Sequence, residues 1–242
     1  MRQLGLSVLT LAVAAGSASA AGPNVDATFL SINPGINFRW SVSGSGFGGN
    51  PDPSGYFNWT RTGGDYPGLQ GNFTTFCLEL TQSINFNQTY SFKVVDPAVA
   101  PSVSGPNGET QPLGALGKAR MRELFGRFFN GLNTGSAIDG AAFQFAVWGI
   151  VYDANLVLNE PADTYILRDS AGLFPFAGGS DPAFNAAFAQ AQTFLSQIDG
   201  TGPLADLIAL TNPNDQDQII PAPGALALLG LGGLAAGRRR RR

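Results

Sequence analysis

The chain has 242 residues, with 14 basic and 17 acidic side chains, one cysteine and no histidine. The lack of histidine excludes catalytic triads that need an imidazole base, histidine metal ligands and pH sensing by imidazole. The single cysteine, Cys77, excludes a disulfide within the chain. Arg2 and Arg238–Arg242 account for six of the basic residues, and every acidic residue lies between them. This acidic middle part offers no basic surface to nucleic acid, so we expect no nucleic-acid partner.

The N-terminus has the order of a secretory signal peptide. Residues 1–3 are positively charged, residues 4–15 are apolar, and Ala18-Ser19-Ala20 supplies the small residues that a signal peptidase reads. The apolar run is too short for a transmembrane helix and is followed directly by polar chain. We therefore expect a signal peptide over residues 1–20, cleavage after Ala20 and export of the remainder.

Alternating apolar and polar residues in the first half predict antiparallel strands. The expected strands are 24–44 with a turn at Pro34-Gly35, 56–61, 73–81 and 88–95. An aromatic content of 11% indicates a packed core beneath them. We expect this half to form an antiparallel sheet or sandwich.

The second half changes to helical periodicity. Helices are expected over 113–128, over 141–153 after a capping-box spacing at Ser136 and Asp139, and from Asp181-Pro182 to about residue 198. Short strands are expected at 164–168 and 207–210. The fold class is therefore α+β, with one domain over 21–212 and a polar linker over 213–220.

The C-terminus combines three features in order. Pro221-Ala222-Pro223 is followed by an uncharged run, 224–237, and then by the cluster Arg238–Arg242. The run reaches roughly 20 Å as a helix, which is less than the about 30 Å of a bilayer core. Terminal arginines keep such a segment in the membrane with their charges on the cytoplasmic side. We expect a short apolar helix that anchors the chain transiently.

This three-part order resembles the PEP-CTERM sorting signal of exported proteins from Gram-negative bacteria that make exopolysaccharide. The residues that carry the resemblance are Pro221, Ala222, Pro223, Arg238, Arg239 and Arg240. The usual Pro-Glu-Pro is Pro-Ala-Pro here. The resemblance implies sorting through the membrane to the cell surface by an exosortase-type processing enzyme, in addition to the signal peptidase.

One pair of residues points to chemistry. Gln144 is the only amide in the apolar helix 141–153, and a buried amide costs about 1–3 kcal/mol unless it is hydrogen-bonded. If this helix packs on the strand that carries Cys77, the thiol and the amide meet. Attack of the thiolate on the carboxamide would expel ammonia and leave a thioester, which an amine or a hydroxyl group of a partner can open.

Phe76-Cys77-Leu78 and the segment from Gln144 to Trp148 resemble the paired motifs of thioester domains in surface adhesins of Gram-positive bacteria. The resemblance implies that Cys77 and Gln144 are the cross-linking pair, shielded by Trp148. We expect Phe76 and Glu79 to shield the pair as well, and Glu79 shares a strand face with Cys77. Two plainer interpretations remain open: Cys77 is a small buried hydrophobic residue, and Gln144 holds a loop or strand carbonyl.

The sequence therefore favours a non-enzymatic, structural or adhesive surface protein without a metal or cofactor. Its expected partners are polysaccharide or surface amine and hydroxyl groups. The alternative is a non-covalent carbohydrate-binding module of the exopolysaccharide matrix that uses exposed Trp40, Tyr56 or Trp59. A hydrolase with Cys77 as nucleophile is disfavoured because no histidine can activate the thiol.

Overall fold

The computed structural model describes residues 22–42, 52–101, 111–153, 155–158, 165–169 and 181–222. The predicted signal peptide, the apolar run 224–237 and the sorting residues Pro223, Arg238, Arg239 and Arg240 lie outside these ranges. The described strands are β1 (Asn24–Val42), β2 (Asp52–Gly63), β3 (Asn72–Cys77), β4 (Thr89–Val95), β5 (Tyr165–Asp169), β6 (Leu207–Thr211) and β7 (Gln218–Pro221). The described helices are α1 (Gly114–Phe128), α2 (Ala137–Tyr152) and α3 (Pro182–Ser196), with 3-10 turns at Pro97–Val99 and Phe129–Gly131.

All described strand pairs are antiparallel, and the sheet closes on itself. The order β2-β3-β7-β6-β4-β1 returns to β2 through the pairing of β1 with β2, which makes a six-stranded barrel. β5 extends the sheet by pairing with the far end of β1, from Phe38 to Val42. The predicted antiparallel sheet with three helices is therefore confirmed, and its closure into a barrel is a feature that the alternation of residues did not predict.

The predicted turn at Pro34-Gly35 is wrong, because β1 continues through it as one strand. The register of β1 against β2 shifts between Ile32 and Gly35, so Pro34 lies at a bulge, where its missing N–H breaks no ladder hydrogen bond. Gly35 pairs with Gly55, and a Cβ atom on Gly55 would lie 2.3 Å from the carbonyl oxygen of Pro34. This close backbone approach requires glycine, and the chain bends here instead of reversing.

The predicted polar linker over 213–220 is wrong in its last part, because residues 218–221 form β7. Gln218 and Ile219 are fully buried, and β7 pairs with β3 on one side and with β6 on the other. The backbone N–H of Ala222 donates to the carbonyl of Asp206 just beyond the strand. The domain therefore extends past the predicted boundary at 212, and β7 joins β3 to β6 in the barrel.

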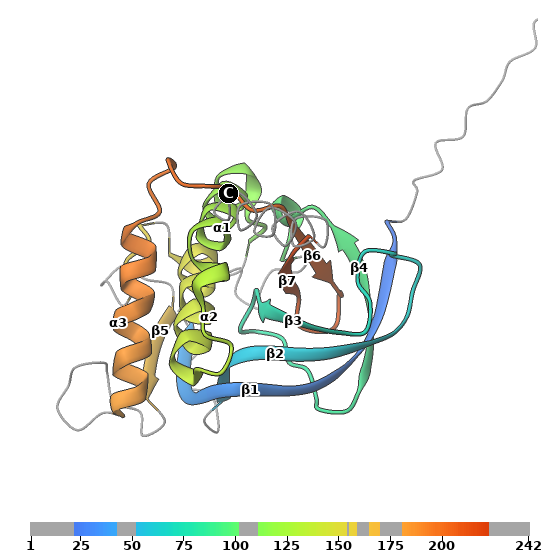
Figure 1. Ribbon diagram of the computed structural model, residues 1–242, viewed down its shortest axis with the longest axis horizontal. Helices are drawn as coiled ribbons and strands as arrows, with labels where there is room; N and C mark the ends of the chain where they lie inside the picture. Colours follow the sequence, from blue (N-terminus) through green and yellow to red (C-terminus); the bar gives the residue numbers. More distant parts are fainter. Residues whose placement is uncertain are drawn as a thin grey trace, which may run out of the picture.

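The helices pack against one end of the barrel, with α2 lying between α3 and the strands (Figure 1). The predicted caps are confirmed: the Ser136 hydroxyl accepts a hydrogen bond from the Asp139 N–H, and the Asp181 carboxylate accepts one from the Ala183 N–H. α2 is buried on nearly every side. A Cβ atom on Gly149 would meet the Leu195 side chain at 2.6 Å, so glycine permits the close contact of α2 with α3.

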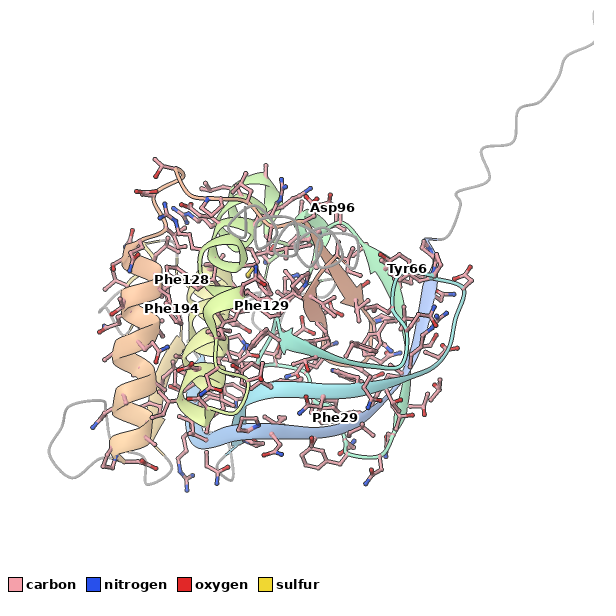
Figure 2. The ribbon with its side chains drawn as sticks, in the orientation of Figure 1. Phe29, Tyr66, Asp96, Phe128, Phe129 and Phe194 are labelled. Carbon is pink, nitrogen blue, oxygen red and sulfur yellow. The ribbon has the colours of Figure 1, made fainter. Side chains whose placement is uncertain are left out.

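Aromatic rings join the layers. Phe29 of β1 lies in the barrel wall, 4.9 Å from the indole ring of Trp59, whereas Phe128 of α1 stacks on Phe194 of α3 at 4.6 Å between ring centroids (Figure 2). Such pairs contribute about 0.5–1.5 kcal/mol beyond the area that they bury. Among the described residues, no helix combines the length and apolarity needed to cross a bilayer.

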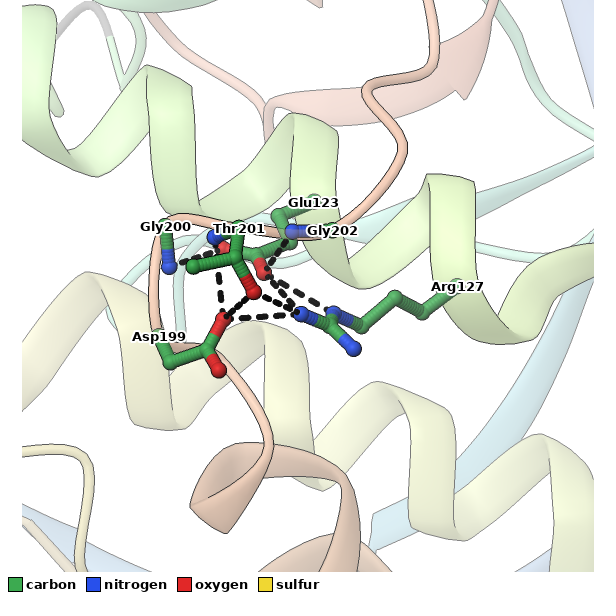
Figure 3. A network of polar contacts seen from close by, with 6 residues as sticks. All are labelled: Glu123, Arg127, Asp199, Gly200, Thr201 and Gly202. Carbon is green, nitrogen blue, oxygen red and sulfur yellow. Dashed lines mark hydrogen bonds and ion pairs between the residues drawn. The ribbon is translucent and has the colours of Figure 1, made fainter.

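A carboxylate on α1 holds the loop that follows α3 (Figure 3). Glu123 is buried, and its oxygens accept hydrogen bonds from the backbone N–H groups of Gly200 and Gly202, both at 2.8 Å, and from Arg127. Arg127 also contacts the Asp199 carboxylate at 2.8 Å. Burial by itself would raise the pKa of Glu123, but the hydrogen bonds from Arg127 and the two glycines outweigh it and lower that pKa.

Replacing Glu123 by Gln should destabilise the fold by about 1–3 kcal/mol, because an amide nitrogen then faces a donor that needs an acceptor. The pKa of Glu123 is lowered in the folded state, so its contribution is complete above the ordinary value of 4.5 and is lost as the pH falls through the lowered pKa. Urea unfolding of both proteins between pH 7 and pH 3 measures the difference, which should shrink on the acid side.

The matched control is Asp206→Asn. Its carboxylate, 74% exposed, pairs with Arg122 at the surface, and such pairs contribute about 0–1 kcal/mol. An equal loss of stability in both variants would show that Glu123 acts only as another surface ion-pair partner.

Candidate functional site

The structure brings Cys77 and Gln144 together across 67 residues of sequence. The Gln144 carboxamide oxygen accepts a hydrogen bond from the Cys77 backbone N–H at 2.8 Å, and its nitrogen donates to the Cys77 carbonyl, also at 2.8 Å. Both residues are fully buried. The partner that the buried amide was expected to have is therefore the backbone of the residue that carries the only thiol.

The pairing pattern of the sheet explains why Gln144 reaches this point. β2 pairs with β3 only as far as Thr75, so Cys77 has no strand on that side. On the other side, the Leu78 N–H donates to the Asp217 carbonyl, which leaves the backbone groups of Cys77 directed away from β7. An amide side chain has the donor and the acceptor of a peptide group, so the Gln144 carboxamide replaces the missing strand.

The sulfur of Cys77 lies in a closed environment. Its thiol donates to the Glu79 carbonyl oxygen at 2.7 Å. Burial is the largest cause that raises the pKa of Cys77 well above its ordinary value. Glu79, once it is ionised, and Asp217 raise this pKa further, while the neighbouring indole of Trp148 acts in the opposite direction. The thiol therefore keeps its proton at neutral pH and is not a free nucleophile.

The side chain of Glu79 is part of the surroundings of Cys77, although β3 ends at Cys77 and Glu79 lies just beyond it. One of its side-chain oxygens, Oε1, accepts a hydrogen bond from the Asp217 N–H at 3.0 Å, and the other, Oε2, has no hydrogen-bond partner among the described residues. Burial and the neighbouring Asp217 carboxylate raise the pKa of Glu79 to about 8. At neutral pH this carboxyl group holds a proton and carries no charge.

The residues just before β7 complete the site, and the sequence did not reveal them. Gln216 donates from its side-chain amide to the carbonyls of Glu79 and Gln82. The Asp217 carboxylate accepts a hydrogen bond from the Asn212 N–H at 2.7 Å. The polar residues of this segment predict a solvated linker. Only the apolar pair Ile219-Ile220 that follows in β7 indicated that the segment is buried.

The two aromatic residues expected to shield the pair have different surroundings. Trp148 is 2% exposed and packs on Phe38, with 5.2 Å between ring centroids. Its indole borders the Cys77 sulfur and also lines a cavity of about 260 Å³ together with Phe38 and Leu80. The ring of Phe76 lies in a cluster with Phe143 of α2, at 4.6 Å between centroids. Trp148 therefore contacts the sulfur and also lines a cavity.

The exposed aromatic platform expected for carbohydrate binding is not formed. Trp59 is 1% exposed, and its indole N–H donates to the Thr75 hydroxyl at 2.9 Å inside the barrel. Tyr56 is 4% exposed. Trp40 is half-buried at the first cavity, where its N–H donates to Asp52. The Trp59 ring points into the barrel, whereas the Tyr56 ring lies between the strands and α2, where a Cβ atom on Gly140 would meet it at 2.6 Å. The prediction that Tyr56 and Trp59 are exposed is therefore wrong.

No group of three or more metal-binding side chains is present in the part of the chain that the structure describes. Comparison of the chain with protein-family models, with curated proteins and with solved structures gives no match. The site is therefore interpreted from its own geometry.

Replacing Gln144 by Leu should destabilise the fold by about 2–4 kcal/mol, because the buried N–H and carbonyl of Cys77 would both lose their partner. Chemical denaturation measures this loss. Gln190→Leu is the matched control, since Gln190 makes one partly buried hydrogen bond, to Asp139 at 3.2 Å. A loss no larger than that of the control would contradict the role assigned to Gln144.

The raised pKa of Glu79 predicts a pH dependence of the opposite sign to that of Glu123. The unfolded chain releases this proton near pH 4.5, whereas the folded protein keeps it to about pH 8, so raising the pH between these values destabilises the wild type. The slope is at most about 1.4 kcal/mol per pH unit. Glu79→Gln should lack this slope and gain stability relative to the wild type up to pH 8, as measured by urea unfolding between pH 4 and pH 9.

The same titration of Glu123→Gln is the control, because its effect is confined to acid pH. Parallel stability curves for Glu79→Gln and the wild type between pH 5 and pH 8 would mean that Glu79 is ionised in the folded protein.

Proposed function

We propose that this chain is an exported structural and adhesive surface protein in which Cys77 and Gln144 form an internal thioester for covalent attachment. The observation that supports it is the placement of the Gln144 carboxamide, held by two hydrogen bonds of 2.8 Å on the backbone of Cys77. An amide fixed at the residue that carries the thiol has lost the orientational freedom that otherwise opposes the reaction.

The bond changes are balanced without another reactant. The Cys77 sulfur attacks the carboxamide carbon of Gln144, the carbon–sulfur bond forms, and the carbon–nitrogen bond breaks. The thiol proton leaves with the nitrogen, so that ammonia is the only by-product. A partner amine or hydroxyl group later attacks the same carbon, forms an amide or ester with the side chain of residue 144 and returns the free thiol.

The surroundings supply what this reaction needs. Full burial of Cys77 protects a thioester from hydrolysis. The thiol needs a proton acceptor because its pKa is raised, and the chain has no histidine. We assign this role to the ionised form of Glu79, which is the minor form at neutral pH because the pKa of this carboxyl group is about 8. The leaving nitrogen then takes the proton from Glu79.

The export part of the proposal rests on the sequence of the two ends. Residues 1–20 have the order of a signal peptide, and residues 221–242 have the order of a sorting signal with a short apolar helix and an arginine cluster. A site without imidazole that reacts once suits an attachment protein better than an enzyme that turns over. Surface amines and hydroxyl groups, including those of polysaccharide, are the partners of this function.

One measurement tests both parts. The protein is recovered from the outside of an expressing Gram-negative host, and its intact mass is determined under denaturing conditions. We expect a chain that begins at Ala21 and is lighter by one ammonia than its sequence. Cys77→Ala and Gln144→Glu should each have the plain polypeptide mass, and incubation of the wild type with methylamine should add one methylamine to the thioester form.

The two parts can fail separately. A plain polypeptide mass together with a titratable thiol in denaturant would remove the thioester and leave export intact. A chain that still begins at Met1 and stays in the cytoplasm would remove export, whatever the state of Cys77.

A further inference from the structure

A second cavity, of about 340 Å³, opens beside the segment that joins α1 to α2. Its polar lining comes from Asn33, Tyr56, Asn58, Thr74, Asn130 and Thr134. Phe129 and Leu132 supply the apolar part. Phe129 lies where the helices meet the barrel (Figure 2). Among the residues that the structure describes, the lining thus contains amides, hydroxyl groups and one phenyl ring, and no charged side chain.

Part of this lining is fixed by the fold. The Thr74 hydroxyl donates to the Asn58 carboxamide oxygen at 3.1 Å, and the Asn58 nitrogen donates to the Asn33 carbonyl at 2.7 Å. The Tyr56 hydroxyl donates to the Asn133 carbonyl at 3.2 Å. These bonds hold the wall formed by β2 and β3 in one arrangement before any ligand arrives, which lowers the entropic cost of binding.

The remaining polar side chains are free. The side chains of Asn33, Asn130 and Thr134 make no hydrogen bond with the described residues, and all three are exposed at the mouth of the cavity. Each amide presents a donor next to an acceptor, and the hydroxyl group serves as either. A ligand that fills the cavity therefore needs neighbouring groups that both donate and accept.

The chemistry of the lining selects among ligands. An ionic ligand would lose hydration without meeting an opposite charge, so a neutral ligand is favoured. Vicinal hydroxyl groups of a sugar match adjacent amide donors and acceptors, and the apolar face of a sugar ring can pack on Phe129. An extended peptide needs an unpaired strand edge, whereas β2 and β3 are paired with each other beside this cavity.

We propose that this cavity binds a neutral sugar, as one or two uncharged hexose units of a polysaccharide. The cavity volume lies at the lower end of the range of about 300–1,000 Å³ for ligand pockets. The acidic chain would repel polymers of sugar acids, in agreement with a neutral ligand. This site goes beyond the proposed thioester and uses neither Cys77 nor Gln144.

The test is titration calorimetry of the full exported protein with methyl glycosides of glucose, galactose and mannose and with N-acetylglucosamine. At least one should bind with a dissociation constant of about 1 mM, as expected for a single sugar on a few hydrogen bonds. Asn130→Ala and Thr134→Val should each weaken binding about tenfold without affecting folding, because these side chains make no internal hydrogen bond. Asn37→Ala, exposed on β1 outside the cavity, is the matched control and should bind as the wild type does.

Several results would overturn the proposal. The proposal is wrong if none of the four sugars binds at about 100 mM, a concentration far above the expected dissociation constant. It is also wrong if Asn130→Ala and Thr134→Val leave the binding unchanged. Tighter binding of glucuronate would assign the cavity to an anion, and tighter binding of N-acetyl-triglycine amide would assign it to a peptide. Repeating the titration with Cys77→Ala separates this site from the thioester, since that variant should bind sugar normally.

Discussion

The two hydrogen bonds between the Gln144 carboxamide and the backbone of Cys77 connect the helical layer to the barrel. Without them, α2 would cover two buried backbone groups that have no partner, and each such group costs about 1–3 kcal/mol. The apolar surface of α2 favours burial of the helix, but the hydrophobic effect is not directional and does not fix the position of α2 along the barrel. The directional bonds of one amide determine which turn of α2 lies over the end of β3.

The interior contains several buried polar side chains, some of which are hydrogen-bonded to one another. Trp59 donates to Thr75, Thr75 donates to the Gln218 side chain, and all three residues are buried. This chain crosses β2, β3 and β7. Beside it, the buried carboxyl groups of Glu79 and Asp217 lie close together. Burial of Glu79, reinforced by the Asp217 carboxylate, keeps Glu79 protonated at neutral pH. A satisfied polar network of this kind specifies which strands pair, whereas apolar side chains tolerate several arrangements.

The two proposed sites are neighbours, since β3 carries both Cys77 and the cavity-lining Thr74, but they follow different chemical rules. The Cys77–Gln144 site is closed, and the reactivity proposed for it would depend on the exclusion of water and on a carboxyl group with a raised pKa. The cavity near Phe129 is open and neutral, and its free amides lie at its mouth. A surface protein that holds a neutral polymer reversibly in one place and reacts with a neighbouring group in another would join weak recognition to permanent attachment.

Local patterns in the sequence determined the class of most elements. Side-chain alternation predicted the strands of the first half, and Ser136 and Asp181 marked the starts of two helices, because these signals depend on neighbouring residues only. The amide of Gln144 stood out because a polar group in an apolar helix needs a partner. The same local logic failed at Pro34, where a bulge absorbs the proline, and it gave no sign that the sheet closes.

Only the tertiary structure decided which residues from distant parts of the chain contact each other. Gln218 looks like part of a solvated linker in the sequence, yet it is buried because β3 and β6 offer backbone and side-chain partners from far away in the chain. Tyr56 and Trp59 look like candidates for an exposed sugar platform in the sequence, yet α2 covers the ring of Tyr56 and the barrel encloses that of Trp59. Local patterns therefore predicted most strands, the helices and the need of Gln144 for a partner, and the resemblance named Cys77 as the partner residue. Only the tertiary structure decided that Gln144 binds the backbone of Cys77 and that residues 218–221 form a strand, because long-range pairing depends on contacts that no local pattern encodes.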